Sequence, residues 1–465
     1  MPVKFFVQNF GCRATQADGA AIERSLAQRG LLAATSANEA ELVVLNTCTV
    51  TAAADADARA AIRRIHRENP GCRILVTGCY AQRAPEEIAS LEGVSGVIGN
   101  SHKHQIANMA VPAGKDFFPL LALTPQAASG AEALHSPVLV GDIFAHTDLL
   151  AAPVFEATAE VAVATGSTRT RPNLKVQDGC DNRCSFCIIP SVRGHSRSLP
   201  LADVLHEVEG LVRAGYREMV ISGINLGRWG HDLTPQRRFE ELLHTILECT
   251  AIEKIRISSV EPMDWSSELI DLVTSHPRIA RHAHVPLQSG SDHVLRIMHR
   301  KYRPWHYAER VSKVRERSQV AAIGADVMVG FPGETDELFE ENRQFIAALP
   351  FTYLHIFTFS ARPGTPAATM PDQVPPQVAR ERHKILRDLI AEKNHAFRQS
   401  FIGTRLNAIT LSTPSEVENS TEALTDNFLK LQLEGKHLSN KWIEAKITTL
   451  TEDGLRGAIQ SPIFD

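Results

Sequence analysis

Two stretches of the chain alternate between short apolar runs and longer amphipathic runs, and this rhythm restricts the fold more than any other feature. Within residues 1–110 it predicts strands at VKFFVQNF, ELVVLNT, RILVTG and GVIGN. Helices are expected at GAAIERSLAQRG, which Gly30 closes, at Ala52–Glu68 and near Pro85–Leu91. Apolar strands that alternate with helices are typical of an open parallel sheet covered on both faces.

The same rhythm returns at Asn173 and continues to about residue 360. The expected strands are LKVQD, EMVISG, KIRISSV, HAHVPLQ, GADVMVGF and YLHIFTF, with helices such as LADVLHEVEGLVRAG and ELFEENRQFIAALP between them. Six successive βα units predict a curved parallel sheet or a partial (β/α)6 barrel. The fold class is therefore α/β.

Two other segments lack this rhythm. Residues 111–170 are rich in Ala, Pro, Ser and Gly, and we expect a connector with a strand or two, such as SPVLVGDIF. After a polar helix at Pro376–Phe401, the runs RLNAITL, FLKLQLEG and WIEAKITTL alternate like strands and predict a small antiparallel β-barrel. The expected division is 1–110, a connector at 111–170, then 171–400 and 401–465.

Charge and cysteine content narrow the class of protein. The formal net charge is −4, so the chain is not basic throughout and any nucleic-acid contact has to use local patches. The opening MPVKFFVQNFGC turns polar too soon for a secretory signal, and no apolar run reaches about 18 residues, so we expect no membrane span. Eight cysteines in a chain of 465 residues indicate thiols or metal ligands in a reducing compartment, which favours the cytoplasm.

Cys180, Cys184 and Cys187 lie in one short segment, DGCDNRCSFCIIP, after the first strand of the second α/β region. Three thiolates in one loop can hold an iron–sulfur cube and leave its fourth iron open for a substrate or cofactor. The alternative is a structural zinc site, but zinc normally takes a fourth Cys or His ligand, for which the nearest candidate is His195. We therefore favour an iron–sulfur cluster.

A second set of cysteines follows the first three predicted strands of the N-terminal region: Cys12, Cys48 and Cys79. The carboxyl ends of parallel strands share one edge of a sheet, where ligands collect, so the topology predicts that these thiols meet. Gly11 and Gly78 precede two of them and allow the backbone to turn closely around a cluster. Cys72 begins the strand that Cys79 ends, so we expect an ordinary small buried residue there, and likewise at Cys249.

These residues resemble a known family. The spacing C-x3-C-x2-C after a strand resembles the radical S-adenosylmethionine (SAM) superfamily, and GC at Cys12, NTCTVT around Cys48 and TGCYAQ around Cys79 resemble the methylthiotransferases. The resemblance covers nearly the whole chain, including RGHSRS, HVPLQSGSDHVLRIMHRKY and DVMVGFPGET. The last segment is similar to a TRAM domain, a small RNA-binding β-barrel.

Within this family, NTCTVT and GCYAQ are most similar to the branch that acts on N6-threonylcarbamoyladenosine next to the tRNA anticodon. Other branches act on isopentenyladenosine in tRNA or on an aspartate of a ribosomal protein, and they stay open as alternatives. The segment RATQADG after Cys12 departs from the family pattern and bears on this choice of substrate.

The resemblance implies two [4Fe-4S] clusters and SAM as cofactors. The cluster on Cys180, Cys184 and Cys187 would bind SAM at its open iron and cleave it to a radical, while the cluster on the other three cysteines would hold or supply sulfur. A second SAM would provide the methyl group. The implied partners are the tRNA anticodon stem-loop and a flavodoxin- or ferredoxin-like electron donor, with no membrane, and we expect a monomer.

Candidate SAM contacts lie at or near the carboxyl ends of predicted strands, where barrel chemistry collects. They are Ser222, Gly223, Asn225, Ser259, Glu261, Gln288 and Asp326. A strand cap or a core hydrogen bond would use the same residue types.

The distribution of charge gives only weak evidence about which segment contacts RNA. Arg405–Asp465 contains six Lys or Arg and nine Asp or Glu, a net charge of −3, so an RNA role for this segment rests on resemblance. Basic patches are expected instead at Arg296, His299, Arg300, Lys301 and Arg303, at Arg59, Arg63, Arg64 and Arg67, and at Arg193, His195 and Arg197. The acidic final segment favours a protein substrate, and a non-catalytic iron–sulfur electron carrier would need far fewer domains.

Overall fold

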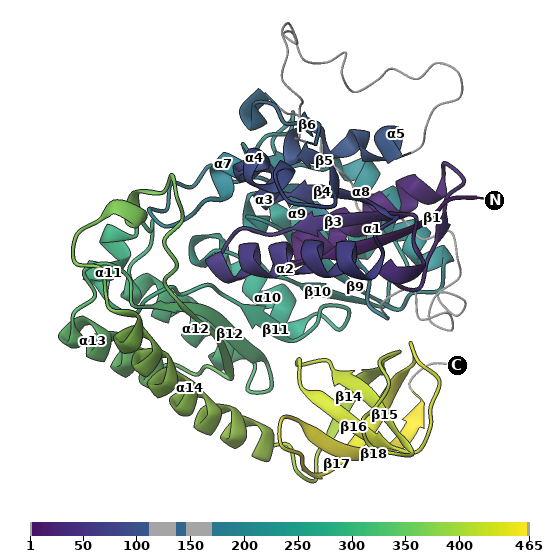
Figure 1. Ribbon diagram of the computed structural model, residues 1–465. Helices are drawn as coiled ribbons and strands as arrows, with labels where there is room; N and C mark the ends of the chain where they lie inside the picture. The colour runs from purple at the N-terminus through teal and green to yellow at the C-terminus, as the bar shows by residue number, and fades with distance from the viewer. Residues whose placement is uncertain (1, 111–135, 146–169, 463–465) are drawn as a thin grey trace, which may run out of the picture. The chain divides into compact units, whose positions relative to one another are not determined.

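The computed structural model describes residues 2–110, 136–145 and 170–462 (Figure 1). It divides into two compact units. Unit 1 comprises Met1–Pro153, Gln177–Ser198 and Ser360–Thr365, and unit 2 comprises Val154–Val176, Leu199–Phe359 and Pro366–Asp465. The four-part division expected from the sequence stays a prediction.

Unit 1 is built on a six-stranded parallel sheet with the order β2-β1-β3-β4-β5-β6. Its strands are β1 (Lys4–Asn9), β2 (Leu32–Ala33), β3 (Leu42–Thr47), β4 (Arg73–Gly78), β5 (Val94–Gly99) and β6 (Val138–Leu139). Its helices are α1 (Arg13–Ala27), η1 (Ala37–Glu39), α2 (Ala52–Glu68), α3 (Cys79–Arg83), α4 (Pro85–Ala89), η2 (Asn100–Gln105), α5 (Ile106–Ala110), η4 (Ile143–Ala145) and α7 (Ile189–Arg193). The predicted open parallel sheet is confirmed, whereas α3, β2 and the early start of α1 were not foreseen.

The sheet of unit 1 is apolar on both faces because neighbouring side chains of a strand point to opposite sides. In β3, Val43 and Leu45 join the core that α2 covers, together with Ile62. Leu42 and Val44 join the opposite core, which α1 and α5 cover. Fully burying a side chain of this kind contributes about 1.5–3 kcal/mol, so the continuous apolar run ELVVLNT is what the two covered faces require.

Unit 2 contains the second α/β region, which forms two neighbouring sheets, β10-β9-β7-β8 and β11-β12-β13. The strands are β7 (Asn173–Asp178), β8 (Arg197–Ser198), β9 (Glu218–Gly223), β10 (Lys254–Ile257), β11 (His282–His284), β12 (Ala322–Val329) and β13 (Tyr353–Thr358); β8 and the end of β7 belong to unit 1. A single parallel bridge, Ile255↔Ile279, links the edges of the two sheets. The six predicted strands are all present and follow one another in space, which confirms the partial barrel; the short antiparallel β8 was not predicted.

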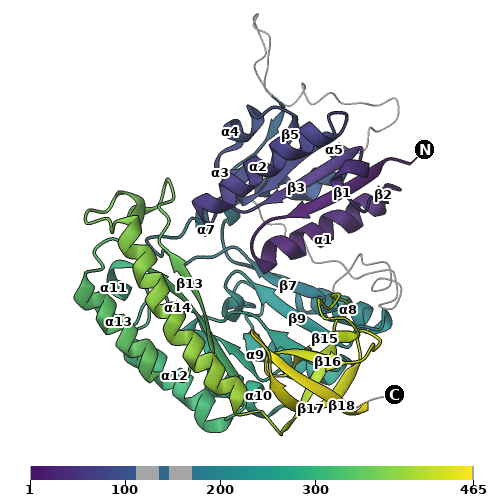
Figure 2. The same cartoon turned by 60° about the horizontal axis from the view of Figure 1, so that its bottom comes forward.

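Helices alternate with these strands, and the last of them, α14, packs against β13 (Figure 2). They are α8 (Leu201–Arg213), η5 (Leu226–Arg228), α9 (Phe239–Cys249), η6 (Pro262–Asp264), α10 (Ser267–Ser275), α11 (Asp292–Ile297), α12 (Pro304–Arg317), α13 (Asp336–Ala348), η7 (Pro366–Thr369) and α14 (Pro376–Gln399). The helix predicted at Pro376–Phe401 is therefore confirmed to within two residues of its end.

The C-terminal strands close into a barrel with the order β14-β15-β16-β18-β17. They are β14 (Arg405–Thr410), β15 (Ser420–Thr425), β16 (Lys430–Glu434), β17 (Trp442–Leu450) and β18 (Leu455–Pro462). The small barrel is confirmed, with one correction: β16 and β18 pair in parallel, so the barrel is not wholly antiparallel. The strands β15 and β18 were not predicted.

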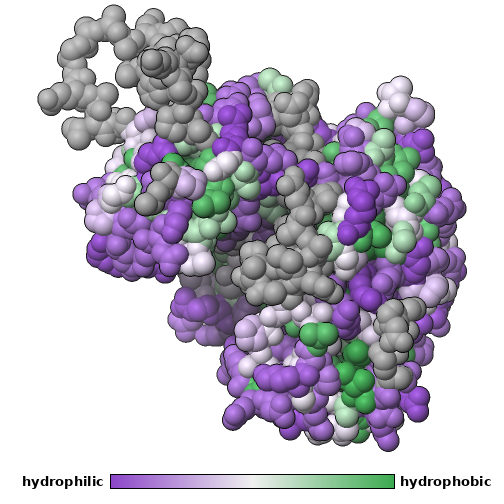
Figure 3. Space-filling model, turned by 90° about the vertical axis from the view of Figure 1, so that its right-hand side faces the viewer, coloured by the Kyte–Doolittle hydropathy of each residue, from purple (hydrophilic) through white to green (hydrophobic). Residues whose placement is uncertain are grey.

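Most of the predicted connector, 111–135 and 146–169, lies outside the described residues. Its expected strand SPVLVGDIF contains β6, a short parallel partner of β5. Among the described residues, no helix is long and apolar enough to cross a membrane. On the face shown in Figure 3, hydrophilic residues predominate and hydrophobic residues lie in small groups among them.

Candidate functional site

The first set of cysteines lies where three neighbouring strands of unit 1 end. Cys12 precedes α1, Cys48 follows β3, and Cys79 is the first residue of α3, directly after β4. The strand register aligns these ends, because Asn9 pairs with Asn46 and Thr47 pairs with Gly78. Cys48 and Cys79 are buried and Cys12 is exposed, so the set opens toward solvent on one side.

The surroundings of Cys48 fit a shared metal cluster. Burial, followed by the neighbouring thiols of Cys79 and Cys12, raises the pKa of the Cys48 thiol to about 12. A bound metal would favour the ionised form of the Cys48 thiol, because coordination holds the sulfur as thiolate. Gly11 leaves the space that this requires: a Cβ there would lie 2.5 Å from the Cys48 Cβ and 2.7 Å from its Sγ.

Cys79 contacts the segment that follows the second set of cysteines. Its side chain packs in one apolar cluster with Ile188 and Val192, and Ile188 is the residue after Cys187. The Asn100 Nδ2 donates to the Cys79 Sγ at 3.5 Å and to the Val192 carbonyl at 2.7 Å. Unit 1 therefore contains both sets of cysteines, and these contacts connect the backbone around Cys79 to the segment that follows Cys187.

The second set of cysteines lies in the loop after β7. The Cys187 N–H donates to the Cys184 carbonyl at 3.1 Å, and the Asn182 N–H donates to the Cys180 Sγ at 3.4 Å, an interaction that stabilises a thiolate. His195, the candidate fourth ligand of a zinc site, instead places its Nδ1 2.8 Å from the Asp181 Oδ1. The loop thus presents three thiols of the kind that an iron–sulfur cluster with one open iron requires.

A buried network of charged side chains lies beside both sets. Arg193 contacts Asp178 at 2.8 Å and Asp18 at 3.0 Å, and Lys103 contacts Asp18 at 2.8 Å. Burial opposes the charge of Arg193, but Asp178, Cys79 and Asp18 outweigh it and raise its pKa well above the usual value. Burial lowers the pKa of Lys103, which Asp18 opposes. Arg193 is 2% exposed, so the expectation that it faces RNA is wrong.

A second buried network follows Cys48 directly. Thr49 donates to Asp55 at 2.6 Å, and Arg83 contacts the same carboxylate at 2.8 Å. Arg362, from the part of unit 1 that follows β13, also pairs with Asp55 and donates to the Thr49 Oγ1 at 2.9 Å. These contacts fix the backbone next to Cys48. Arg362 and its partners gave no signal in the sequence, because they lie about 300 residues apart.

The remaining two cysteines stand apart from both sets. Cys72 is buried in the core that α2 covers, as predicted. Cys249 is the last residue of α9, but it is exposed, so its expected burial is wrong.

The expected SAM contacts lie in unit 2, at or after the strands β9 to β12. Ser222 and Gly223 end β9, Asn225 precedes η5, Ser259 and Glu261 follow β10, Gln288 follows β11, and Asp326 lies within β12. Ser222 donates to the Leu174 carbonyl at 3.4 Å, Ser259 lies 2.6 Å from His284, Glu261 pairs with Arg300, and Asp326 lies 3.2 Å from His355. Gln288 has a positive φ of 62°.

The expected basic patches differ in how exposed they are. Arg63, Arg64 and Arg67 are exposed along α2. Arg300 is buried against Glu261, and both Arg296 and Arg303 pair with Asp292, so that patch is largely neutralised. Two cations of the C-terminal barrel are also paired, Arg405 with Glu444 and Lys430 with Asp453. The α2 surface is thus the most available basic patch of those expected.

Comparison with known proteins places these features in a family. The chain matches the radical SAM superfamily over residues 174–346 and the uncharacterized protein family UPF0004 over residues 4–99. It is 33% identical to threonylcarbamoyladenosine tRNA methylthiotransferase MtaB of Aquifex aeolicus, over 93% of this chain and 97% of that protein. It is 34% identical to the protein of the same name from Bacillus subtilis, over 94% of this chain and 92% of that one.

A related enzyme is slightly less similar. The tRNA-2-methylthio-N(6)-dimethylallyladenosine synthase of Aquifex aeolicus is 29% identical over 96% of this chain and 93% of its own length. Among solved structures, the radical SAM methyltransferase TsrM from Kitasatospora setae, with cobalamin and a [4Fe-4S] cluster bound, has a TM-score of 0.54. It covers 79% of this chain and 77% of its own at 16% identity, a likeness that shows the fold alone.

Proposed function

Because the chain belongs to the radical SAM family of threonylcarbamoyladenosine tRNA methylthiotransferases, we propose that it inserts sulfur and a methyl group at C2 of N6-threonylcarbamoyladenosine next to the tRNA anticodon. The observation that carries this proposal is the presence of two separate sets of three cysteines in one compact unit. A methylthio transfer needs radical chemistry and a sulfur source together, and the two sets of cysteines would provide one site for each.

The cofactors of this family are [4Fe-4S] clusters and SAM. Cys180, Cys184 and Cys187 would hold the cluster that binds SAM, and Cys12, Cys48 and Cys79 would hold the second. When bound, SAM and its cluster supply radical chemistry that removes hydrogen from an unactivated aromatic carbon, which acid–base side chains cannot do.

The chain's own residues hold these groups in place and set their electrostatics. The buried cations Arg193 and Lys103 lie near the thiol of Cys79 and offset thiolate charge there. Asn100 donates a hydrogen bond to the same sulfur. In unit 2, the proposed SAM contacts Ser222, Gly223, Asn225, Ser259, Glu261 and Gln288 lie at or after the ends of β9, β10 and β11, and the proposed contact Asp326 lies within β12.

The partners follow from the same proposal. The tRNA would bind by its anticodon stem-loop, and a flavodoxin- or ferredoxin-like protein would supply electrons. The protein would act as a monomer in the cytoplasm. Isopentenyladenosine is the alternative base, since the dimethylallyladenosine synthase of Aquifex aeolicus is 29% identical to the chain. An aspartate of a ribosomal protein is the other alternative substrate.

The test is an anaerobic assay of the reconstituted protein with SAM, a chemical reductant and tRNA that carries either threonylcarbamoyladenosine or isopentenyladenosine. Mass spectrometry of the digested nucleosides should find the methylthio product from the first tRNA only. Cys48→Ala should abolish the product, whereas the matched control Cys249→Ala, at an exposed cysteine outside both sets, should keep it. Product from the isopentenyl tRNA alone would reassign the branch, and no product from either tRNA with both clusters intact would overturn the proposal.

A further inference from the structure

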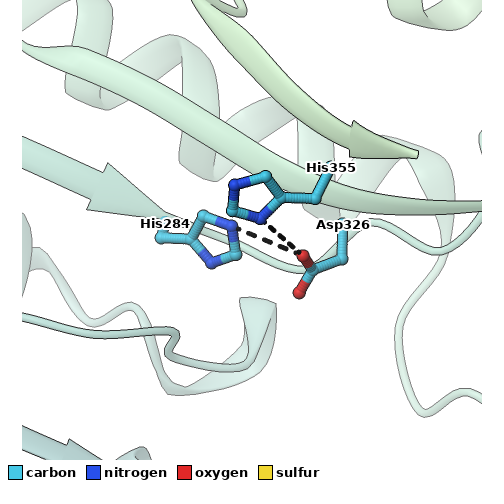
Figure 4. A group of neighbouring side chains, drawn as sticks. All are labelled: His284, Asp326 and His355. Atoms are coloured by element: carbon cyan, nitrogen blue, oxygen red, sulfur yellow. Dashed lines mark hydrogen bonds and ion pairs between the residues drawn. The ribbon is translucent and has the colours of Figure 1, made fainter. Parts of the chain in front are cut away.

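Three side chains on neighbouring strands of unit 2 point toward one another: His284 on β11, Asp326 on β12 and His355 on β13 (Figure 4). The Asp326 Oδ1 lies 3.2 Å from the His355 Nδ1 and 3.6 Å from the His284 Nε2. One ligand atom from each residue lies within 4.8 Å of the other two. We propose that these three residues bind one divalent transition-metal ion, separate from the cysteine sites, so that Asp326 serves this ion in place of the SAM contact proposed above.

The strand register fixes this arrangement. Asp326 pairs directly with His355, and His284 pairs with Gly324, two residues before Asp326. Because side chains alternate along a strand, residues two apart share a face, so all three ligands project from the same side of the sheet. Ligands that project from adjacent strands are held more firmly than ligands on loops, which favours a preformed metal site.

The spacing of the ligand atoms matches metal coordination better than hydrogen bonding alone. Metal–nitrogen and metal–oxygen bonds of about 2.0–2.2 Å place neighbouring ligand atoms roughly 3–3.5 Å apart. The 3.2 Å contact between Asp326 and His355 fits both a hydrogen bond and two ligands of one metal ion. The 3.6 Å contact between Asp326 and His284 is too long for a hydrogen bond, but a metal ion can bridge it with little movement.

The surroundings supply what such a site needs beyond its three ligands. The Ser259 Oγ lies 2.6 Å from the His284 Nδ1, the ring nitrogen that faces away from Asp326. A metal-binding histidine almost always forms a hydrogen bond at its other ring nitrogen, which fixes the ring and its tautomer. The His284 side chain is 7% exposed, Asp326 25% and His355 54%, so one side of the site is open to water or a substrate.

The donor set limits which ion fits. Two imidazole nitrogens and one carboxylate oxygen, with positions left open, are typical of catalytic zinc and of non-haem iron(II). Magnesium and calcium prefer all-oxygen sites and fit poorly. Zinc is the useful probe in this protein, because added iron could not be told apart from the iron of the clusters.

The experiment measures zinc bound to the reconstituted holoenzyme after equilibrium dialysis against Zn²⁺, with metals quantified by mass spectrometry. Wild type should bind one equivalent more than His355→Ala and Asp326→Asn. The control His395→Ala, at an exposed histidine of α14, should bind as wild type does. Unchanged iron and sulfide contents would show that each variant is folded and loaded.

X-ray absorption at the zinc edge provides an independent readout. The extra equivalent should show nitrogen and oxygen ligands and no sulfur. Equal zinc contents in wild type and the two triad variants, or a coordination shell of sulfur, would overturn the proposal.

Discussion

At the scale of the residue, Gly11 shows how tightly the N-terminal thiols are packed. Its φ is +89°, and a Cβ would collide with both the Cβ and the Sγ of Cys48. Gly30 also has a positive φ, +82°, but has nothing within 4 Å of the same position. Both alanine variants carry backbone strain of about 1–2 kcal/mol, and only Gly11→Ala adds a clash at a ligand.

We therefore expect Gly11→Ala to lose about four irons per chain after reconstitution, and Gly30→Ala to keep the full content. Iron and sulfide analysis of the two purified variants decides this. Equal iron contents in the two variants would show that Cys48 does not bind a metal in this geometry.

Arg193 supports a second residue-level prediction. Removing its charge leaves Asp178 buried without its cation, a change that typically costs about 3–5 kcal/mol. Arg193→Met should therefore lower the thermal unfolding midpoint clearly, whereas Arg63→Met, at an exposed site on α2, should barely change it. Scanning calorimetry under anaerobic conditions gives the comparison. Indistinguishable midpoints for the two variants would mean that the buried network contributes nothing to stability.

At the scale of the element, helix α1 contains an acid whose ionisation is linked to folding. Burial raises the pKa of Glu23 from its ordinary 4.5 to about 7. Between these two values the folded protein binds more protons than the unfolded chain, so this contribution to stability is full below about pH 4.5 and is lost as the pH rises toward 7.

Glu23→Gln replaces the titratable acid with a neutral amide, so the variant does not lose this stability as the pH rises. The unfolding midpoints of wild type and variant should be close near pH 5 and should separate by about pH 8, with the variant more stable. A difference between the midpoints that stays constant over this range would exclude the raised pKa.

The strands and helices that could be predicted from the sequence are those with a clear period. Helix α2 has the bounds expected for it, and four of the six strands of the second α/β region lie within their expected runs, whereas β7 begins one residue and β12 two residues before theirs. The strands β2 and β8 have two residues each and so carry no period, and the parallel pairing of β16 with β18 depends on contacts far apart in the chain.

The parts of the candidate site also differ in how well they could be predicted from the sequence. Strand order alone brings Cys12, Cys48 and Cys79 together, so the sequence was sufficient to predict that they meet. Asp18 lies on α1 and Lys103 on η2, and they come close to Arg193 only in the folded unit. No local sequence pattern therefore predicts these contacts. Arg193 was misplaced because its neighbours in sequence, His195 and Arg197, are polar and suggested a basic surface.

At the scale of the whole molecule, the charge distribution predicts how tRNA binds. The chain has a net charge of −4 and its acidic final barrel pairs cations internally, so the exposed arginines of α2 are the expected phosphate contacts. Arg63→Ala and Arg64→Ala should each weaken tRNA binding and reduce the slope of log affinity against log salt by about 0.7–0.9. The control is Arg213→Ala on α8, an exposed arginine that pairs with Glu209.

Filter binding over a range of salt concentrations measures both quantities. If the α2 variants and the control have the same slope as wild type, the tRNA binds through another surface.

We infer that unit 1 holds two separate four-iron clusters, and iron and sulfide analysis of the reconstituted protein tests this claim. Wild type should contain about eight irons, and about four should be lost in Cys180/Cys184/Cys187→Ala and about four in Cys12/Cys48/Cys79→Ala. Full iron content in the Cys12/Cys48/Cys79 variant would contradict the claim, leaving a radical SAM enzyme with a single cluster and no sulfur source of its own.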